Sequence, residues 1–116
     1  MDQPQTNIES SLSIRQRVER ARKRQYERYG MDITNAKVPY ELLAENNKLT
    51  DHQQRMLTRI SMKHKWSNRV QIKIIRIART ISDLAEAEQI TDESIWEAMT
   101  LRRLNEKQQT LAAKEQ

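Results

Sequence analysis

Cationic side chains at the start of one helical segment are the residues of this chain best suited to bind a phosphate group. Ser67 is a favoured helix N-cap residue, and Arg69 follows it within the first turn. The backbone amides of a first turn favour an anion, and a guanidinium can hold two phosphate oxygens at once. At about 100° per residue, Lys73 and Arg76 extend a basic stripe from Arg69. This pattern predicts a site for nucleotide phosphates, although first-turn arginines also occur on surfaces that bind nothing.

The same segment must form an amphipathic helix if it is to position those cations. Apolar residues recur there at the three-or-four spacing of one helical face, at Val70, Ile74, Ile77, Ile81 and Leu84. We expect this helix to be half buried, half basic and central to the fold. Aspartate in place of Ile77 or Ile81 is then expected to unfold the domain, because it would bury an unpaired charge.

Capping patterns predict the helices on either side of this central one. Ser13 with Gln16 fits a capping box that opens a helix ending at Gly30. Thr50 with Gln53 fits a second capping box, which opens a helix over 51–64.

Other signals complete an all-helical prediction. Pro39 predicts the start of a short helix that ends near residue 46 or 47, and Thr91 the start of the last helix. Trp66 falls at the corner before the central helix, where we expect a packing anchor rather than a side chain that stacks on a cofactor. No segment alternates as a half-buried strand does. The fold class is therefore all-α, a compact bundle of about four to five helices.

Several of these segments resemble a known family. Residues 67–69 and 74–84, which read SNR and IIRIARTISDL, resemble the C-terminal lid motif of magnesium-chelatase-like AAA+ ATPases of the ComM competence-protein type. Residues 10–25 resemble the helix that opens that lid, Asn35 and Ala36 its next connector, and residues 90–103 its final helix. The resemblance predicts a lid domain over 10–105, between a disordered leader or linker at 1–9 and a frayed tail at 106–116.

The resemblance also implies a function. Arg69 would be the family's sensor-2 arginine, which contacts ATP bound by a separate core domain of the same protein and couples hydrolysis to motor movement in DNA processing. Lys73 stands where the family usually has an arginine, so its contact would be less geometrically defined. ATP with magnesium is expected in the intact protein only, and no cofactor is expected for this chain alone. We expect a homo-oligomer when the protein is intact, and a monomer or weak dimer otherwise.

The chain does not contain the ATP-binding part of such an enzyme. A phosphate-cradling loop needs several glycines, whereas Gly30 is the one glycine in the sequence and no G-x-x-x-x-G-K-[ST] occurs. We therefore expect no catalysis by this chain alone and interpret it as a fragment of an ATPase.

A basic nucleic-acid-binding module is the alternative hypothesis. The formal net charge is +5 and the sequence pI is about 9.7, both of which favour polyanions. Candidate contacts are Arg15, Arg17, Arg22 and Arg24 in the first helix. Glutamates are interleaved there, so a solvated surface with intrahelical ion pairs is the simpler interpretation. A purely structural interaction module is the third hypothesis, and it holds if Arg69 contacts nothing.

Composition argues against several other classes. The sequence has no cysteine, and its two histidines, His52 and His64, lack a shared set of carboxylates, so we expect no metal site and interpret both as surface residues. No apolar run is long enough to cross a bilayer, and no secretory signal core is present. We expect no membrane partner and a cytoplasmic location.

Overall fold

The computed structural model describes residues 10–115, and side chains through Leu111. Within that range the chain forms α2 (Ser11–Tyr29), α3 (Tyr40–Asn46), α4 (Asp51–His64), α5 (Asn68–Leu84) and α6 (Asp92–Glu115), and no strand. The all-α prediction is confirmed. The leader predicted at 1–9 lies outside the described residues.

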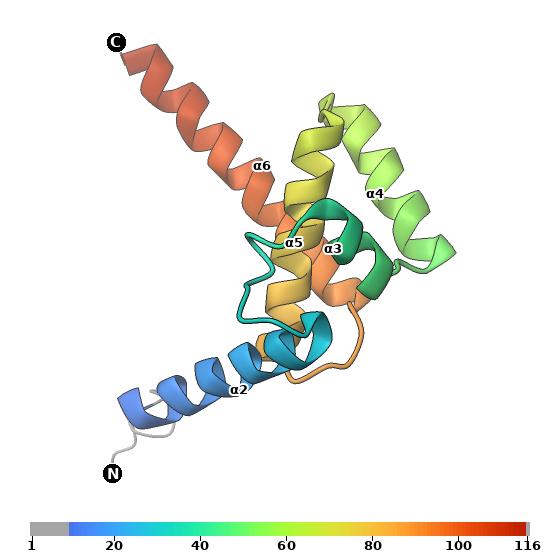
Figure 1. Ribbon diagram of the computed structural model, residues 1–116. Helices are drawn as coiled ribbons and strands as arrows, with labels where there is room; N and C mark the ends of the chain where they lie inside the picture. Colours follow the sequence, from blue (N-terminus) through green and yellow to red (C-terminus); the bar gives the residue numbers. More distant parts are fainter. Residues whose placement is uncertain (1–9, 116) are drawn as a thin grey trace.

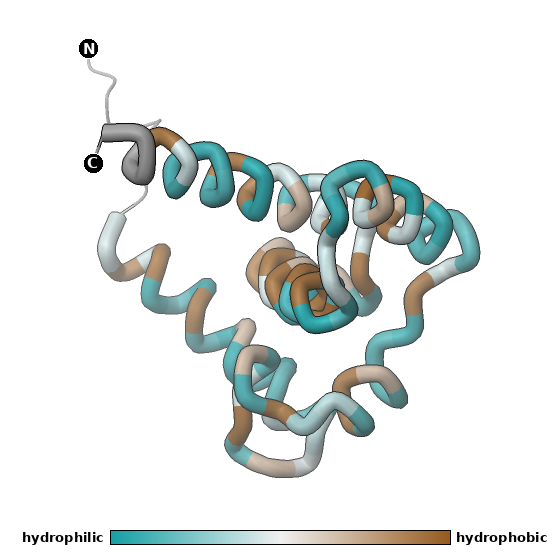
Figure 2. The backbone as a smooth tube through the Cα atoms, turned by 90° about the horizontal axis from the view of Figure 1, so that it is seen from above, coloured by the Kyte–Doolittle hydropathy of each residue, from teal (hydrophilic) through white to brown (hydrophobic). Residues whose placement is uncertain are grey.

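Helix α5 is the centre of the fold, as its apolar pattern predicted. It packs against α6 and α2, while α4 packs against α6 (Figure 1). Figure 2 looks down the axis of α5 and shows the other helices arranged around it. The main core gathers residues of α4, α5 and α6 with the corner and loop beside them: Leu57, Trp66, Ile74, Ala78, Ile90, Ile95, Ala98 and Met99. A smaller cluster, Tyr29, Val38 and Leu43, joins α2 to α3.

Most helix ends follow the capping predictions, although α3 and α6 begin one residue later than predicted, at Tyr40 and Asp92. Both hydrogen bonds of the Thr50 and Gln53 capping box are present, and Gly30 ends α2 in the left-handed conformation at φ 69°. The capping box predicted at Ser13 is wrong, because Ser10 is the N-cap and its Oγ accepts from Ser13 N at 3.0 Å. Serines at 10, 11 and 13 were all available as N-cap residues, and the helix is capped by the first of them because nothing after it disfavours helical backbone.

The buried face of α5 is rotated from the predicted one. Ile74 of the predicted face is buried, and so is Ala78, which was not part of it, whereas Ile77 and Ile81 are only partly buried against the main core. Arg79 and Asp83 are buried in their place. The apolar spacing thus located the helix correctly and misplaced its most buried edge.

Helix α6 is longer than predicted. The residues expected to fray, 106–116, are helical through Glu115, and Gln116 lies outside the described residues. Lysine, glutamine, glutamate, alanine and leucine all have high helix propensity, which explains why the polar tail continues the helix. The first turns of α2 and the last turns of α6 project from the body on the same side (Figures 1 and 2).

Candidate functional site

A sharp corner between α4 and α5 positions the first turn of α5. Lys65 adopts a left-handed backbone at φ 58°, and Ser67 caps α5 by accepting from Val70 N at 3.2 Å. Trp66 fills the corner: it is buried, stacks on His64 at a centroid distance of 5.2 Å, and donates its Nε1–H to the Glu106 carboxylate at 3.0 and 3.1 Å. The prediction that Trp66 anchors packing is confirmed, and the anchor fixes where α5 begins.

The predicted basic stripe lines a groove beside that first turn. This groove, which we call the cationic groove, has a volume of about 530 Å³ and is lined by Ala36, Tyr40, Asn68, Arg69, Ile72, Lys73 and Arg76. Its charged lining residues are all cations, so a carboxylate does not compete for them within the groove. Its composition suits a polyanion such as a nucleotide phosphate chain.

Arg69 and Lys73 are exposed on the wall of the cationic groove. Among the ion pairs and hydrogen bonds of residues 10–115, none involves either side chain, so neither is held by an acidic partner of the described chain. Arg69 also lies in the first turn of α5, at the positive end of the helix dipole. An anion entering the groove would therefore meet an unneutralised guanidinium at a helix end that favours negative charge.

Arg76 differs from the other members of the stripe. It is partly buried, and its Nη1 donates to the carbonyl oxygens of Asn35 and Val38 at 3.0 and 2.6 Å. These contacts fasten the segment between α2 and α3 onto α5. Because this segment leads into Tyr40 on the opposite wall, Arg76 shapes the cationic groove as well as lining it.

A buried ion cluster on α5, which the sequence analysis missed, fixes that helix against its neighbours. Asp83 is fully buried and accepts from both terminal nitrogens of Arg28 on α2, while Arg79 Nη2 lies 3.0 Å from its Oδ1. The side-chain amide of Asn35 also donates from Nδ2 to Asp83 Oδ2, at 2.9 Å. The one sequence signal for this cluster is the (i, i+4) spacing of Arg79 and Asp83, which is equally common on exposed helix faces.

The two arginines of this cluster respond differently to burial. Burial lowers the pKa of Arg79, and the attraction of Asp83 offsets this only in part. Burial also acts to lower the pKa of Arg28, but hydrogen bonding and Coulomb attraction to Asp83 outweigh it and raise that pKa. Arginine remains protonated in proteins, so two cations share one carboxylate. The carbonyls of Ala87 and Glu88, which accept from Arg79 at 2.8 and 3.0 Å, help to balance the excess positive charge.

The arginines predicted as nucleic-acid contacts do not form one surface. On the helical wheel of α2, Arg15 and Arg22 fall on one side of the face that carries buried Ala21, and Arg17 and Arg24 fall on the other side. Arg15 and Arg22 are exposed, whereas Arg17 and Arg24 are of intermediate exposure. The four cations therefore face in two directions.

The predicted intrahelical pairing of α2 is wrong for two of its other arginines. Arg20 pairs with Glu86, in the loop after α5, at 3.0 Å, and Arg28 pairs with Asp83. Both pairs join α2 to distant parts of the chain, because tertiary packing brings acceptors closer than the neighbouring turns of the helix do.

Neither histidine belongs to a metal site in the part of the chain that the structure describes. His52 lies 3.9 Å from Asp92, and His64 stacks on Trp66. No group of three or more potential metal ligands occurs among residues 10–115. The helices of this described range also include none with both the length and the apolar content needed to cross a bilayer.

Comparison with known proteins identifies one family. The model of the C-terminal domain of magnesium chelatase subunit ChlI matches residues 8–102, a range that includes α2 to α5 and the first part of α6. No curated protein and no solved structure matches the chain.

Proposed function

Because the chain belongs to the family of the magnesium chelatase ChlI C-terminal domain, we propose that it acts as the sensor-2 lid of an AAA+ ATPase of the ComM type. In this proposal an AAA+ core domain of the same protein holds ATP and magnesium, and the lid closes over the nucleotide. In the same proposal, the intact protein forms a homo-oligomer and acts in the cytoplasm. The observation that carries the proposal is the exposed Arg69 in a groove whose charged lining residues are all cations.

The chemistry of Arg69 fits this role. Phosphoryl transfer spreads negative charge over the phosphate oxygens, and a guanidinium placed against them stabilises that charge. Lys73, which follows one turn later on the same wall, adds a second cation that can meet a neighbouring phosphate. Arg76 acts through position, since its bonds to the Asn35 and Val38 carbonyls hold the opposite wall in place.

The test is ATP turnover by the intact AAA+ protein that contains this domain. Arg69→Ala is expected to lower kcat by about 100-fold, as loss of a preorganised charge donor does in other enzymes. Arg69→Lys is expected to restore part of that loss, because a lysine keeps the charge but not the two-pronged geometry. Arg59→Ala, at an exposed arginine of α4, is the matched control and should leave turnover unchanged. Equal turnover in Arg69→Ala and the control would refute the assignment.

Direct contact between this domain and DNA is the part of the proposal that is supported by the net charge and the arginines of α2. Duplex DNA titrated at two salt concentrations provides the test, because phosphate contacts weaken steeply as salt rises. Arg15→Ala with Arg22→Ala should weaken salt-dependent binding if one flank of α2 contacts DNA, whereas Arg17→Ala with Arg24→Ala tests the other flank. Binding that is undetectable at low salt would remove DNA as a direct ligand of this domain and also the free-standing nucleic-acid module as an alternative.

A further inference from the structure

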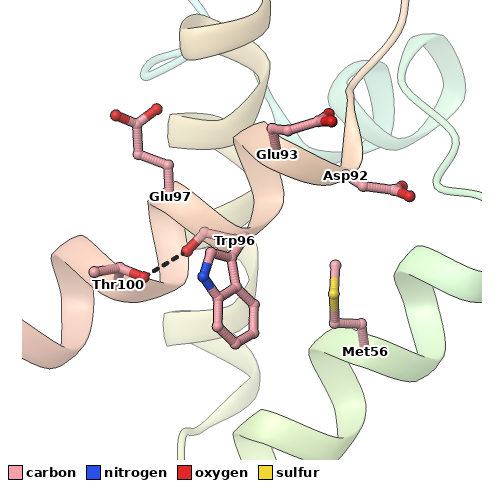
Figure 3. Close-up of a pocket in the computed structure, with 6 residues that line it drawn as sticks. All are labelled: Met56, Asp92, Glu93, Trp96, Glu97 and Thr100. Carbon is pink, nitrogen blue, oxygen red and sulfur yellow. Dashed lines mark hydrogen bonds between the residues drawn. The ribbon is translucent and has the colours of Figure 1, made fainter.

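A second groove, which shares no lining residue with the cationic groove, lies between α4 and α6. We call it the Trp96 groove; it has a volume of about 630 Å³ and is lined by Met56, Asp92, Glu93, Trp96, Glu97 and Thr100. The indole of Trp96 projects from α6, with Met56 of α4 across from it (Figure 3), and Trp96 is 51% exposed. Tryptophan is enriched among the residues that contribute most to protein interfaces, so this exposed indole is a candidate contact for a partner.

The charged lining residues of the Trp96 groove are all acidic. Asp92 is satisfied within the chain, because it accepts from Gln53 Nε2 at 2.9 Å and lies 3.9 Å from His52. Glu93 and Glu97 are exposed and stand four residues apart on α6, a spacing at which like charges repel. A cationic partner would relieve that repulsion, and the apolar floor beside it requires that the partner also bring apolar side chains.

The first turns of α2 have this composition. Ile14 and Val18 are 44% and 39% exposed, and they continue, beyond the body of the protein, the helical face on which Ala21 is buried. They stand at the (i, i+4) spacing of helix-in-groove anchors. Arg15 and Arg22 flank them and are exposed. We call this surface the α2 arm.

We propose that the Trp96 groove is the docking site for the α2 arm of a second copy of this chain. Ile14 and Val18 lie against Trp96 and Met56, and Arg15 and Arg22 meet Glu93 and Glu97. Each copy carries one groove and one arm on different surfaces, so the association is head to tail and continues into a ring or an open chain. Neither surface includes a residue of the cationic groove, so this interface and the role of Arg69 stand or fall separately.

Charge reversal tests the proposal in solution. One variant carries Arg15→Glu and Arg22→Glu, and the other carries Glu93→Lys and Glu97→Lys. Analytical ultracentrifugation at high protein concentration should show self-association of the unmodified chain, and each variant alone should weaken it by about tenfold or more, since like charges then meet. An equimolar mixture should associate again, because each arm then faces a groove of opposite charge. Circular dichroism confirms that each variant is folded.

Trp96→Ala supplies a variant without charge change and should weaken association to a similar extent. Failure of the mixture to recover association, or a monomeric unmodified chain at every concentration, overturns the proposal. So does a result in which reversal of the α2 arm abolishes DNA binding but leaves self-association unchanged, since the arm would then be a nucleic-acid surface.

Cysteine cross-linking tests the geometry directly, because the chain has no cysteine of its own. A chain with Arg15→Cys is mixed with one bearing Glu97→Cys and oxidised, and the mixed dimer should form in preference to either homodimer. Lys48→Cys in place of Glu97→Cys is the control and should give no preferred product, because Lys48 lies outside the Trp96 groove. Equal yields with Glu97→Cys and Lys48→Cys contradict head-to-tail docking.

Discussion

Helix α5 holds two arginines that the fold treats in opposite ways. Arg69, in its first turn, is exposed on the wall of the cationic groove, whereas Arg79 is 1% exposed and bound to Asp83. Both side chains carry the same charge on the same helix. The difference lies in what surrounds them: a carboxylate and carbonyls converge on Arg79, while the lining of the groove offers Arg69 no carboxylate.

This contrast separates an arginine that holds the fold from one that is available to a ligand. Burying an unpaired cation is so unfavourable that Arg79 can be buried only because its acidic and carbonyl partners are buried with it. An exposed cation has no such requirement and can exchange water for an external anion. Substitutions among the partners of Arg79 should therefore lower the free energy of unfolding strongly, whereas substitution of Arg69 should change it little.

The largest expected effect follows from removing the shared carboxylate. Asp83→Ala leaves the buried charges of Arg28 and Arg79 unpaired, and loss of one partner from a buried pair costs about 3–5 kcal/mol. Since domains are typically stable by about 5–15 kcal/mol, such a loss is a large fraction of the total stability. Urea denaturation followed by circular dichroism measures it.

Glu86→Ala is the matched control, because it removes an acidic partner of an α2 arginine that is exposed. It should cost no more than about 1 kcal/mol. Similar losses in the two variants would mean that the buried cluster contributes no more than a surface pair, and the distinction between Arg69 and Arg79 would lose its basis.

The sequence was sufficient to predict the elements of the fold because their signals are local. Thr50 with Gln53 and the glycine at residue 30 each act within a turn of their own position, and the structure bears both out. The Ser13 capping box failed for an equally local reason, since Ser10 offered the same cap one turn earlier. The end of α6 was also predictable from a local signal, because its residues have high helix propensity. Its polar composition was instead interpreted as a sign of fraying.

The candidate site was predictable only in part. The first-turn position of Arg69 can be deduced from its capping serine, but the second wall of the groove comes from Tyr40, which tertiary packing brings there from α3. The partners of Asp83 are likewise distant in sequence, on α2 and in the segment that holds Asn35. Apolar periodicity could not reveal this cluster, because an analysis of that pattern assigns every arginine to the solvent-facing side of a helix.

Substitution of Arg76 is expected to lower the free energy of unfolding by an amount between the large loss at Asp83 and the small change at Arg69. Arg76→Ala removes a charged donor from the carbonyls of Asn35 and Val38, and hydrogen bonds to charged groups contribute about 1.5–3 kcal/mol. The free energy of unfolding should fall by an amount in this range, and amide hydrogen exchange in the segment around Asn35 should become faster. Arg76→Lys should recover part of both effects. Unchanged exchange in that segment would show that the clamp does not order the groove wall.

Substitution of Arg69 is expected to change the free energy of unfolding least, and the direction of that change is informative. A cation in the first turn of a helix stands at the positive end of the helix dipole, where it is unfavourable by about 0.3–1 kcal/mol at low salt. Arg69→Ala should therefore leave the free energy of unfolding unchanged or raise it slightly, and Arg69→Glu should raise it further, with both gains shrinking as salt screens the dipole. The same substitutions are expected to reduce ATP turnover in the intact protein. A clear loss of stability in Arg69→Ala would instead assign this arginine to the fold, as Arg79 is assigned, and would leave the groove without a cation reserved for phosphate.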